Sequence, residues 1–200
     1  MIFVFDLDDT VIDTDGYSEK YIKNFFEKHN LPYKQIFNVA RFAEKKFDWD
    51  NETALEWYKT YGDQMMLEFP FNKDAKEVIN RLYDLGNTIV IATARANDWH
   101  VDPEGITKKW LEQNELKYHK LYIGRIDKEK ICEETNADFS LDDDLKITAR
   151  VGAYFNARGR GISCLFNTAY NQNLEEDVNV VRVKSFKEFF KLTVGEEFIK

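Results

Sequence analysis

The carboxylates near the N-terminus are the residues of this sequence best suited to chemistry. Residues 2–5 are apolar and run directly into Asp6-Leu7-Asp8-Asp9-Thr10. Side chains two residues apart at the end of a strand point the same way, so Asp6 and Asp8 can share one site. Asp142-Asp143-Asp144 follow a second apolar run. Crowded carboxylates are costly without a counter-ion. A hard cation bound by oxygen ligands, usually Mg²⁺ beside phosphates, removes that cost.

Groups that bind anions follow or precede other apolar runs. The run at residues 89–92 leads into Thr93-Ala94-Arg95, which offers a hydroxyl, backbone N–H groups and a guanidinium. All of these are donors suited to a phosphoryl oxygen. Lys128 opens an expected helix before the triple aspartate and brings a further positive charge.

Elements of two kinds alternate along the chain and place these residues. Short apolar runs predict strands, whereas 3.6-residue periodicity predicts helices. Asp102 and Pro103 fit the N-cap and the first position of one helix. The expected strands are residues 2–5, 89–92, 121–123, 139–141, 162–166 and 178–183, and the expected helices are 78–85, one from 103, 128–135, 144–156 and 186–190.

Strands that alternate with helices and are apolar on both faces predict an α/β fold, a Rossmann-like parallel sheet with helices on both faces. The carboxyl ends of such strands line the ligand crevice. Residues 16–73 contain no convincing strand; they predict helices at 17–30, 35–47 and 51–68. We therefore expect a core of residues 1–14 and 74–200, with a small helical cap at 15–73 inserted after the first strand.

Composition restricts the classes of binding partner and the expected cellular location of the protein. Of the 200 residues 36 are acidic and 28 basic, a net charge of −8, which argues against long nucleic acids and against anionic membranes. The chain shows neither a bilayer-spanning run nor a signal peptide, so we expect a cytoplasmic protein. The two cysteines, Cys132 and Cys164, lack metal-ligand spacing and are interpreted as buried thiols.

The order of these groups resembles the four motifs of the haloacid-dehalogenase superfamily of phosphatases: residues 6–10, then Thr93, then Lys128, then Asp142-Asp143. The resemblance implies that Asp6 is the nucleophile, which forms an aspartyl-phosphate, and that Asp8 is the general acid and then the general base. It implies that Thr93 binds the phosphoryl group and that Lys128 pairs with Asp6 and the phosphate. Mg²⁺ would be held by Asp6, the backbone carbonyl of Asp8 and an aspartate of the last motif.

Two of these assignments have competitors. Lys130 lies two residues beyond Lys128; we prefer Lys128 because it lies at the helix entrance. Asp142 competes with Asp143 as the metal ligand; we favour Asp143, the second acid after the apolar run. An acid at position 8 favours phosphate esters, because superfamily members that cleave carbon–halogen bonds lack it.

A finer similarity concerns the substrate. Residues 88–184, with IATARANDW, DFSLDDD and FNTAYNQ, look like the 5′(3′)-deoxyribonucleotidase branch and its bacterial relatives. We therefore expect a small phosphate ester, a nucleoside monophosphate, as substrate. The alternatives are a sugar phosphate or phosphoglycolate, a phosphotransferase with the same residues, and a non-catalytic metal- or phosphate-binding module. Fourteen of the thirty aromatic residues lie between Tyr17 and Phe71, and we interpret most of them as the core of the cap.

Overall fold

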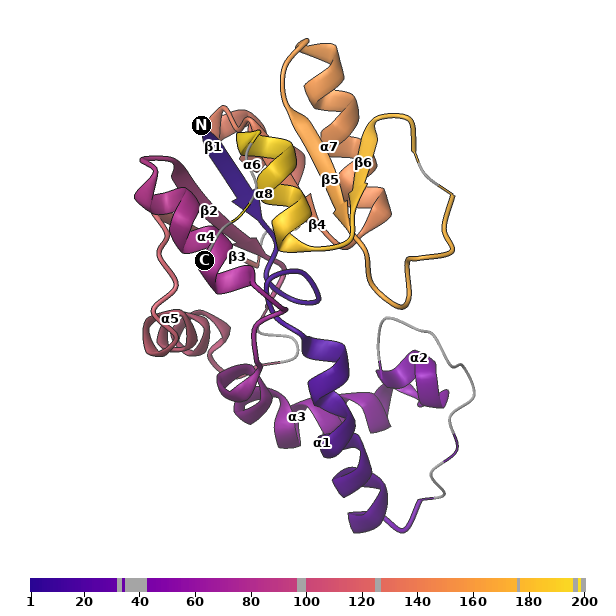
Figure 1. Ribbon diagram of the computed structural model, residues 1–200. Helices are drawn as coiled ribbons and strands as arrows, with labels where there is room; N and C mark the ends of the chain where they lie inside the picture. Colours follow the sequence, from indigo (N-terminus) through magenta and orange to yellow (C-terminus); the bar gives the residue numbers. More distant parts are fainter. Residues whose placement is uncertain are drawn as a thin grey trace.

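A parallel sheet with helices on both faces forms the upper part of the molecule, and a smaller helical lobe lies below it (Figure 1). The computed structural model describes residues 1–31, 34, 43–96, 100–124, 127–175, 177–195 and 198. Within these residues the strands are β1 (Ile2–Phe5), β2 (Thr88–Thr93), β3 (Lys120–Ile123), β4 (Phe139–Asp142), β5 (Ile162–Phe166) and β6 (Val180–Val183). Their order is β3-β2-β1-β4-β5-β6, and every neighbouring pair is parallel. The predicted fold class is confirmed.

The helices match the sequence periodicity closely in the core. They are α1 (Thr14–Lys28), α2 (Ala43–Phe47), α3 (Asn51–Glu68), α4 (Ala75–Asp84), α5 (Pro103–Gln113), α6 (Lys128–Thr135), α7 (Leu145–Ala157) and α8 (Phe186–Val194). Asp102 caps α5 by accepting a hydrogen bond from the N–H of Gly105, as its place before Pro103 predicts.

The two faces of the sheet bury different helices because side chains alternate along each strand. Phe3 and Phe5 of β1 belong to the hydrophobic cluster that includes α4 and α8. Val4 points to the other face, where it packs in a cluster with Cys132 of α6 and Phe155 of α7. Cys132 and Cys164 are both free and buried, which confirms their interpretation as buried thiols, and this burial raises the pKa of each to about 12.

Two short chain segments connect the core with the lower lobe, which we call the cap (α1, α2 and α3). Ile12 and Phe71 form an antiparallel bridge. The N–H of Asp13 donates to the carbonyl of Pro70 at 3.0 Å, and that of Asn72 to the carbonyl of Val11 at 2.9 Å. The outgoing and returning chains therefore lie side by side just below the sheet. The predicted division of the chain at residues 14 and 74 falls next to this pairing and stays a prediction.

The cap agrees with the sequence in part. α3 spans the predicted 51–68, and α1 begins at Thr14, three residues earlier than expected, because Asp13 caps it. Only residues 43–47 of the predicted helix 35–47 are helical in the structure; residues 35–42 lie outside the described residues.

Most cap aromatics that the structure describes pack on one another. The ring centroids of Phe26 and Phe47 are 5.0 Å apart, those of Phe25 and Trp49 5.4 Å, and those of Trp49 and Trp57 5.7 Å. Because these rings fill the space between α1, α2 and α3, they serve as the cap's own core, as interpreted from the sequence.

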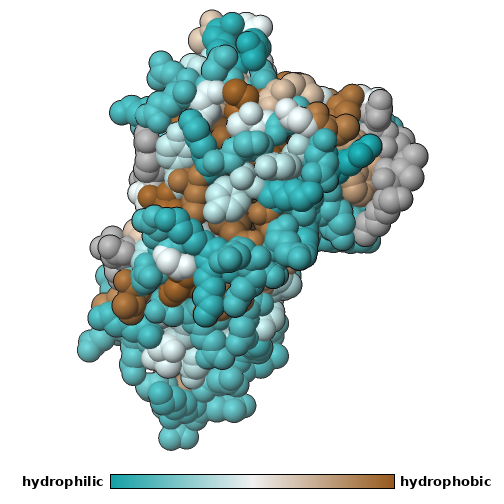
Figure 2. All heavy atoms as spheres, turned by 90° about the vertical axis from the view of Figure 1, so that its left-hand side faces the viewer, coloured by the Kyte–Doolittle hydropathy of each residue, from teal (hydrophilic) through white to brown (hydrophobic). Residues whose placement is uncertain are grey.

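The surface is mainly hydrophilic. Figure 2 shows one face, on which apolar side chains come to the surface mostly near the level where core and cap meet. None of the helices described is both long and apolar enough to cross a membrane.

Candidate active site

The carboxylates that follow β1 lie at the point where the strand order of the sheet reverses, between β1 and β4. The chain moves outward from β1 to β2 and β3 on one side, and through β4, β5 and β6 on the other. In such sheets the crevice at the carboxyl ends of the two central strands is the usual ligand site. The N–H of Asp6 donates to the carbonyl of Leu141 at 2.9 Å, so the first residue after β1 remains attached to β4.

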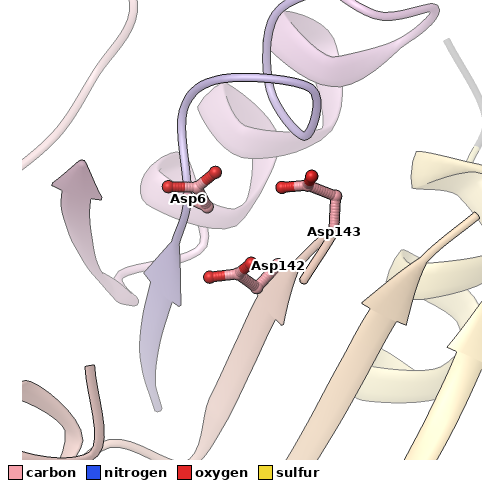
Figure 3. Close-up of side chains that lie close together, drawn as sticks. All are labelled: Asp6, Asp142 and Asp143. Atoms are coloured by element: carbon pink, nitrogen blue, oxygen red, sulfur yellow. The ribbon is translucent and has the colours of Figure 1, made fainter. Parts of the chain in front are cut away.

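Three buried carboxylates converge at this edge. Asp6 follows β1, Asp142 ends β4 and Asp143 comes next (Figure 3). One oxygen from each lies within 4.8 Å of the others, and the three residues are 5 %, 2 % and 0 % exposed. Oxygen donors alone at this spacing fit a hard divalent cation such as Mg²⁺.

Lys128 is the positive charge inside this cluster. Its Nζ donates to Oδ1 of Asp6 and to Oδ2 of Asp142, each at 2.5 Å. It is the first residue of α6, and the side chain of Asp127 caps that helix. Of the two lysines considered, Lys130 lies outside the cluster: its side chain is 67 % exposed and lies 3.8 Å from Asp127.

Charge is unbalanced around Asp6. Three carboxylates and one ammonium leave a net charge of minus two, which a divalent cation would balance. Burial raises the pKa of Asp6 well above its ordinary value; Lys128 opposes this rise, and Asp142, Asp143 and Asp8 add to it. Burial also acts to lower the pKa of Lys128, but Asp142 and Asp6 outweigh it and raise that pKa, so Lys128 stays charged.

The three consecutive aspartates have different partners. The Oδ1 of Asp142 accepts the N–H of Asp144 at 2.8 Å, and the Oδ1 of Asp143 accepts the hydroxyl of Thr10 at 3.1 Å. Asp144 caps α7 by accepting the N–H groups of residues 146 and 147. Both Asp142 and Asp143 therefore stay candidates for the metal, whereas Asp144 has a capping role at the start of a helix.

Asp8 lies in a different environment from Asp6. Its carboxylate is outside the three-aspartate cluster, and its side chain is 34 % exposed. Two nitrogens of Arg95 donate to it: Nε to Oδ2 at 2.9 Å and to Oδ1 at 3.2 Å, and Nη2 to Oδ1 at 2.7 Å. The hydroxyl of Thr93 donates to Oδ2 at 3.2 Å. Burial acts to raise the pKa of Asp8, but the charge and hydrogen bonds of Arg95, with that of Thr93, outweigh it and lower the pKa.

Of the three residues expected to bind phosphate, two direct their side chains at Asp8 and the third is exposed. Thr93 and Arg95 both turn their side chains to Asp8, and Ala94 between them is exposed. Their phosphate-binding role stays a prediction, which for Ala94 concerns its backbone N–H.

The sequence motifs assign no role to Tyr170 and Asn171, although the run FNTAYNQ contains both residues. The hydroxyl of Tyr170 donates to the carboxylate and to the backbone carbonyl of Asp143. The Nδ2 of Asn171 donates to the carbonyls of Asp143 and Phe166, each at 2.8 Å. Both residues follow β5, the neighbour of β4, and only that pairing reveals their role.

Comparisons with known proteins bear on the fold. No protein-family model matches the sequence, and no curated protein does either. Solved structures do match. A haloacid dehalogenase-like family hydrolase from Streptococcus pneumoniae superimposes with a TM-score of 0.62 at 10 % identity, over 98 % of both chains. The chain has the haloacid-dehalogenase-like fold.

Two further structures share this fold. The protein YfnB of Bacillus subtilis, described as bound to magnesium, has a TM-score of 0.62 at 12 % identity, over 96 % of this chain and 97 % of that one. A structure described as a predicted phosphoglycolate phosphatase from Haemophilus somnus has a TM-score of 0.57 at 15 % identity, over 96 % and 97 %. Identities this low establish the architecture; activity has to be argued from the residues.

Proposed function

We propose that this protein is a Mg²⁺-dependent phosphomonoesterase that acts through an aspartyl-phosphate on Asp6. The observation that carries the proposal is the buried cluster of Asp6, Asp142 and Asp143, in which Lys128 pairs with Asp6 and Asp142. A further carboxylate, that of Asp8, follows two residues after Asp6. A carboxylate attacks phosphorus well only when nearby positive charge neutralises the phosphate.

The residues divide the reaction into two displacements. In the first, an oxygen of Asp6 forms a bond to phosphorus and the bond to the ester oxygen breaks. Asp8 has to carry a proton for this step, although Arg95 lowers its pKa, and gives that proton to the leaving oxygen. In the second, water forms a bond to phosphorus, Asp8 takes its proton, and the bond between phosphorus and Asp6 breaks. Inorganic phosphate leaves and Asp6 is restored. Lys128 holds Asp6 in place and contributes positive charge throughout.

Asp6, the backbone carbonyl of Asp8, and Asp143 or Asp142 would hold the Mg²⁺. The ion would neutralise phosphoryl charge. Three buried oxygen donors with an excess of two negative charges fit this ion.

We propose a nucleoside monophosphate as the substrate. Support comes from the similarity of residues 88–184 to the deoxyribonucleotidase branch. The alternative is a sugar phosphate or phosphoglycolate, since one structure of this fold carries the description of a predicted phosphoglycolate phosphatase.

The test is release of inorganic phosphate from a panel of nucleoside monophosphates, sugar phosphates and phosphoglycolate, with Mg²⁺ and with EDTA. We expect Mg²⁺-dependent release from at least one nucleoside monophosphate. Release from sugar phosphates or phosphoglycolate alone would reject the nucleotidase specificity and keep the phosphatase. No release from any member, with the protein folded and Mg²⁺ present, would reject the phosphatase.

A further inference from the structure

Arg95 is an arginine at the candidate active site whose side chain is almost completely buried. Its side chain is 3 % exposed, whereas that of its partner Asp8 is 34 % exposed. An arginine that binds a phosphate has to direct its N–H donors at that phosphate. Arg95 instead lies behind Asp8, and the carboxylate of Asp8 is the group that remains accessible.

The guanidinium is fixed from two sides. Two of its nitrogens, Nε and Nη2, grip the two oxygens of Asp8 in the bidentate geometry that fixes the plane of a carboxylate. The third, Nη1, donates to the hydroxyl of Thr107 at 3.1 Å, and Thr107 is fully buried in α5. Each nitrogen of Arg95 therefore has a partner within the protein.

The surroundings of this pair come from core and cap. Thr93, at the end of β2, adds a hydrogen bond to Asp8. His100, whose ring lies 3.5 Å from Asp63 of α3, also faces the pair; burial and the charge of Arg95 lower its pKa. α5, which anchors Arg95 through Thr107, is itself tied to the end of α3, because the indole of Trp110 donates to the carbonyl of Phe69 at 2.9 Å.

From this geometry we infer that Arg95 is a positioning residue: anchored by Thr107, it holds the Asp8 carboxylate in the orientation needed to take a proton from the attacking water and does not itself bind the substrate phosphate. The inference rests on the proposed function, in which Asp8 transfers the protons. It replaces the phosphate-binding role that the sequence suggests for the Arg95 side chain.

The two roles predict different kinetic defects. Loss of a positioning residue lowers kcat and leaves substrate affinity unchanged, whereas loss of a phosphate ligand raises KM and weakens the binding of inorganic phosphate. Acid–base catalysis contributes about 10²–10⁴-fold, and misplacement of a reacting group costs about 10²-fold. We expect Arg95→Gln to lower kcat by about 10²-fold, with KM and the dissociation constant of inorganic phosphate changed by less than about 3-fold.

A double-mutant cycle with Asp8→Asn makes the test specific. It is measured on p-nitrophenyl phosphate, whose leaving group departs without a proton, so that the residual activity stays measurable. In the Asp8→Asn background we expect Arg95→Gln to cost less than about 3-fold, because the group that it positions is already absent. Arg81→Gln, an exposed arginine of α4, is the matched control and should leave both constants unchanged.

Thr107→Val removes the anchor of Arg95 and leaves the residues around Asp6 untouched. We expect kcat to fall by about 10-fold at constant KM. If Arg95→Gln does not fold, this variant tests the positioning role of Arg95 in its place. A rise in KM and weaker phosphate binding in Arg95→Gln would overturn the inference, as would an undiminished cost in the Asp8→Asn background or unchanged kcat in both single variants. An inactive wild-type protein would overturn the proposed function together with this inference; an active one isolates the inference.

Discussion

Asp6 and Asp8 leave the same strand two residues apart, yet their surroundings differ in charge. Asp6 lies among two other buried carboxylates with Lys128 as the only cation there among the described residues, whereas Asp8 faces a bidentate arginine and a hydroxyl. The pKa of the first is raised and that of the second is lowered. The negative charge around Asp6 therefore exceeds the positive charge that the chain supplies there, whereas Arg95 balances the charge of Asp8.

Asp6→Asn should cause the largest loss. It removes the nucleophile, so we expect turnover to fall by about 10⁴-fold or more in phosphate-release assays. The melting temperature without Mg²⁺ should be unchanged or higher, because the variant removes one of three crowded buried charges. Asp84→Asn, an exposed aspartate paired with Lys117, is the control and should keep full activity. Near-normal turnover in Asp6→Asn would contradict the assignment.

Lys128→Met tests the role of the positive charge beside Asp6. Its removal leaves Asp6 and Asp142 without their buried partner, which typically costs about 3–5 kcal/mol of stability. We expect activity to fall by about 10²–10³-fold. Calorimetric melting should show a loss that Mg²⁺ partly restores. Lys130→Met, two residues away and exposed, should behave as the wild type; equal effects of both variants would refute the assignment.

Metal binding itself should distinguish the two sides. Mg²⁺ at 100 times its dissociation constant stabilises a folded protein by about 2.7 kcal/mol, which should raise the melting temperature of the wild type. The rise should vanish in Asp6→Ala and persist in Asp8→Asn, whose side chain lies outside the cluster. Comparing Asp142→Asn with Asp143→Asn identifies the further ligand. Asp144→Ala, which removes only a helix cap, should lower the starting melting temperature and keep the rise. A rise that survives in Asp6→Ala would place the metal elsewhere.

Tyr170→Phe should have the smallest effect. It removes a hydroxyl that donates to Asp143, and loss of such an outer hydrogen bond weakens metal affinity by about 10-fold. Titration with Mn²⁺, followed by its magnetic resonance signal, measures this directly. Tyr154→Phe, on α7, removes a hydroxyl that accepts a hydrogen bond from Arg158 and is the control. Unchanged affinity in Tyr170→Phe would mean that Asp143 does not depend on this loop or does not bind the metal.

The sequence alone determined the architecture and the convergence of the principal charges. Strand and helix periods are local properties, and a parallel sheet brings the residues after each strand to one edge. For this reason the sequence predicts that Asp6, Asp142 and Asp143 lie together, and the place of Lys128 at the start of α6 favours it over Lys130.

The pairing of side chains at that edge of the sheet depends on tertiary packing. Arg95 and Asp8 are 87 positions apart, and nothing local in the sequence indicates that the guanidinium turns to a carboxylate and is anchored by Thr107. Tyr170 reaches Asp143 because β5 lies beside β4. Asp144 caps a helix although it follows Asp143 directly. Spacing fixes which residues arrive at the edge of the sheet, but their partners depend on packing between elements that are distant along the chain.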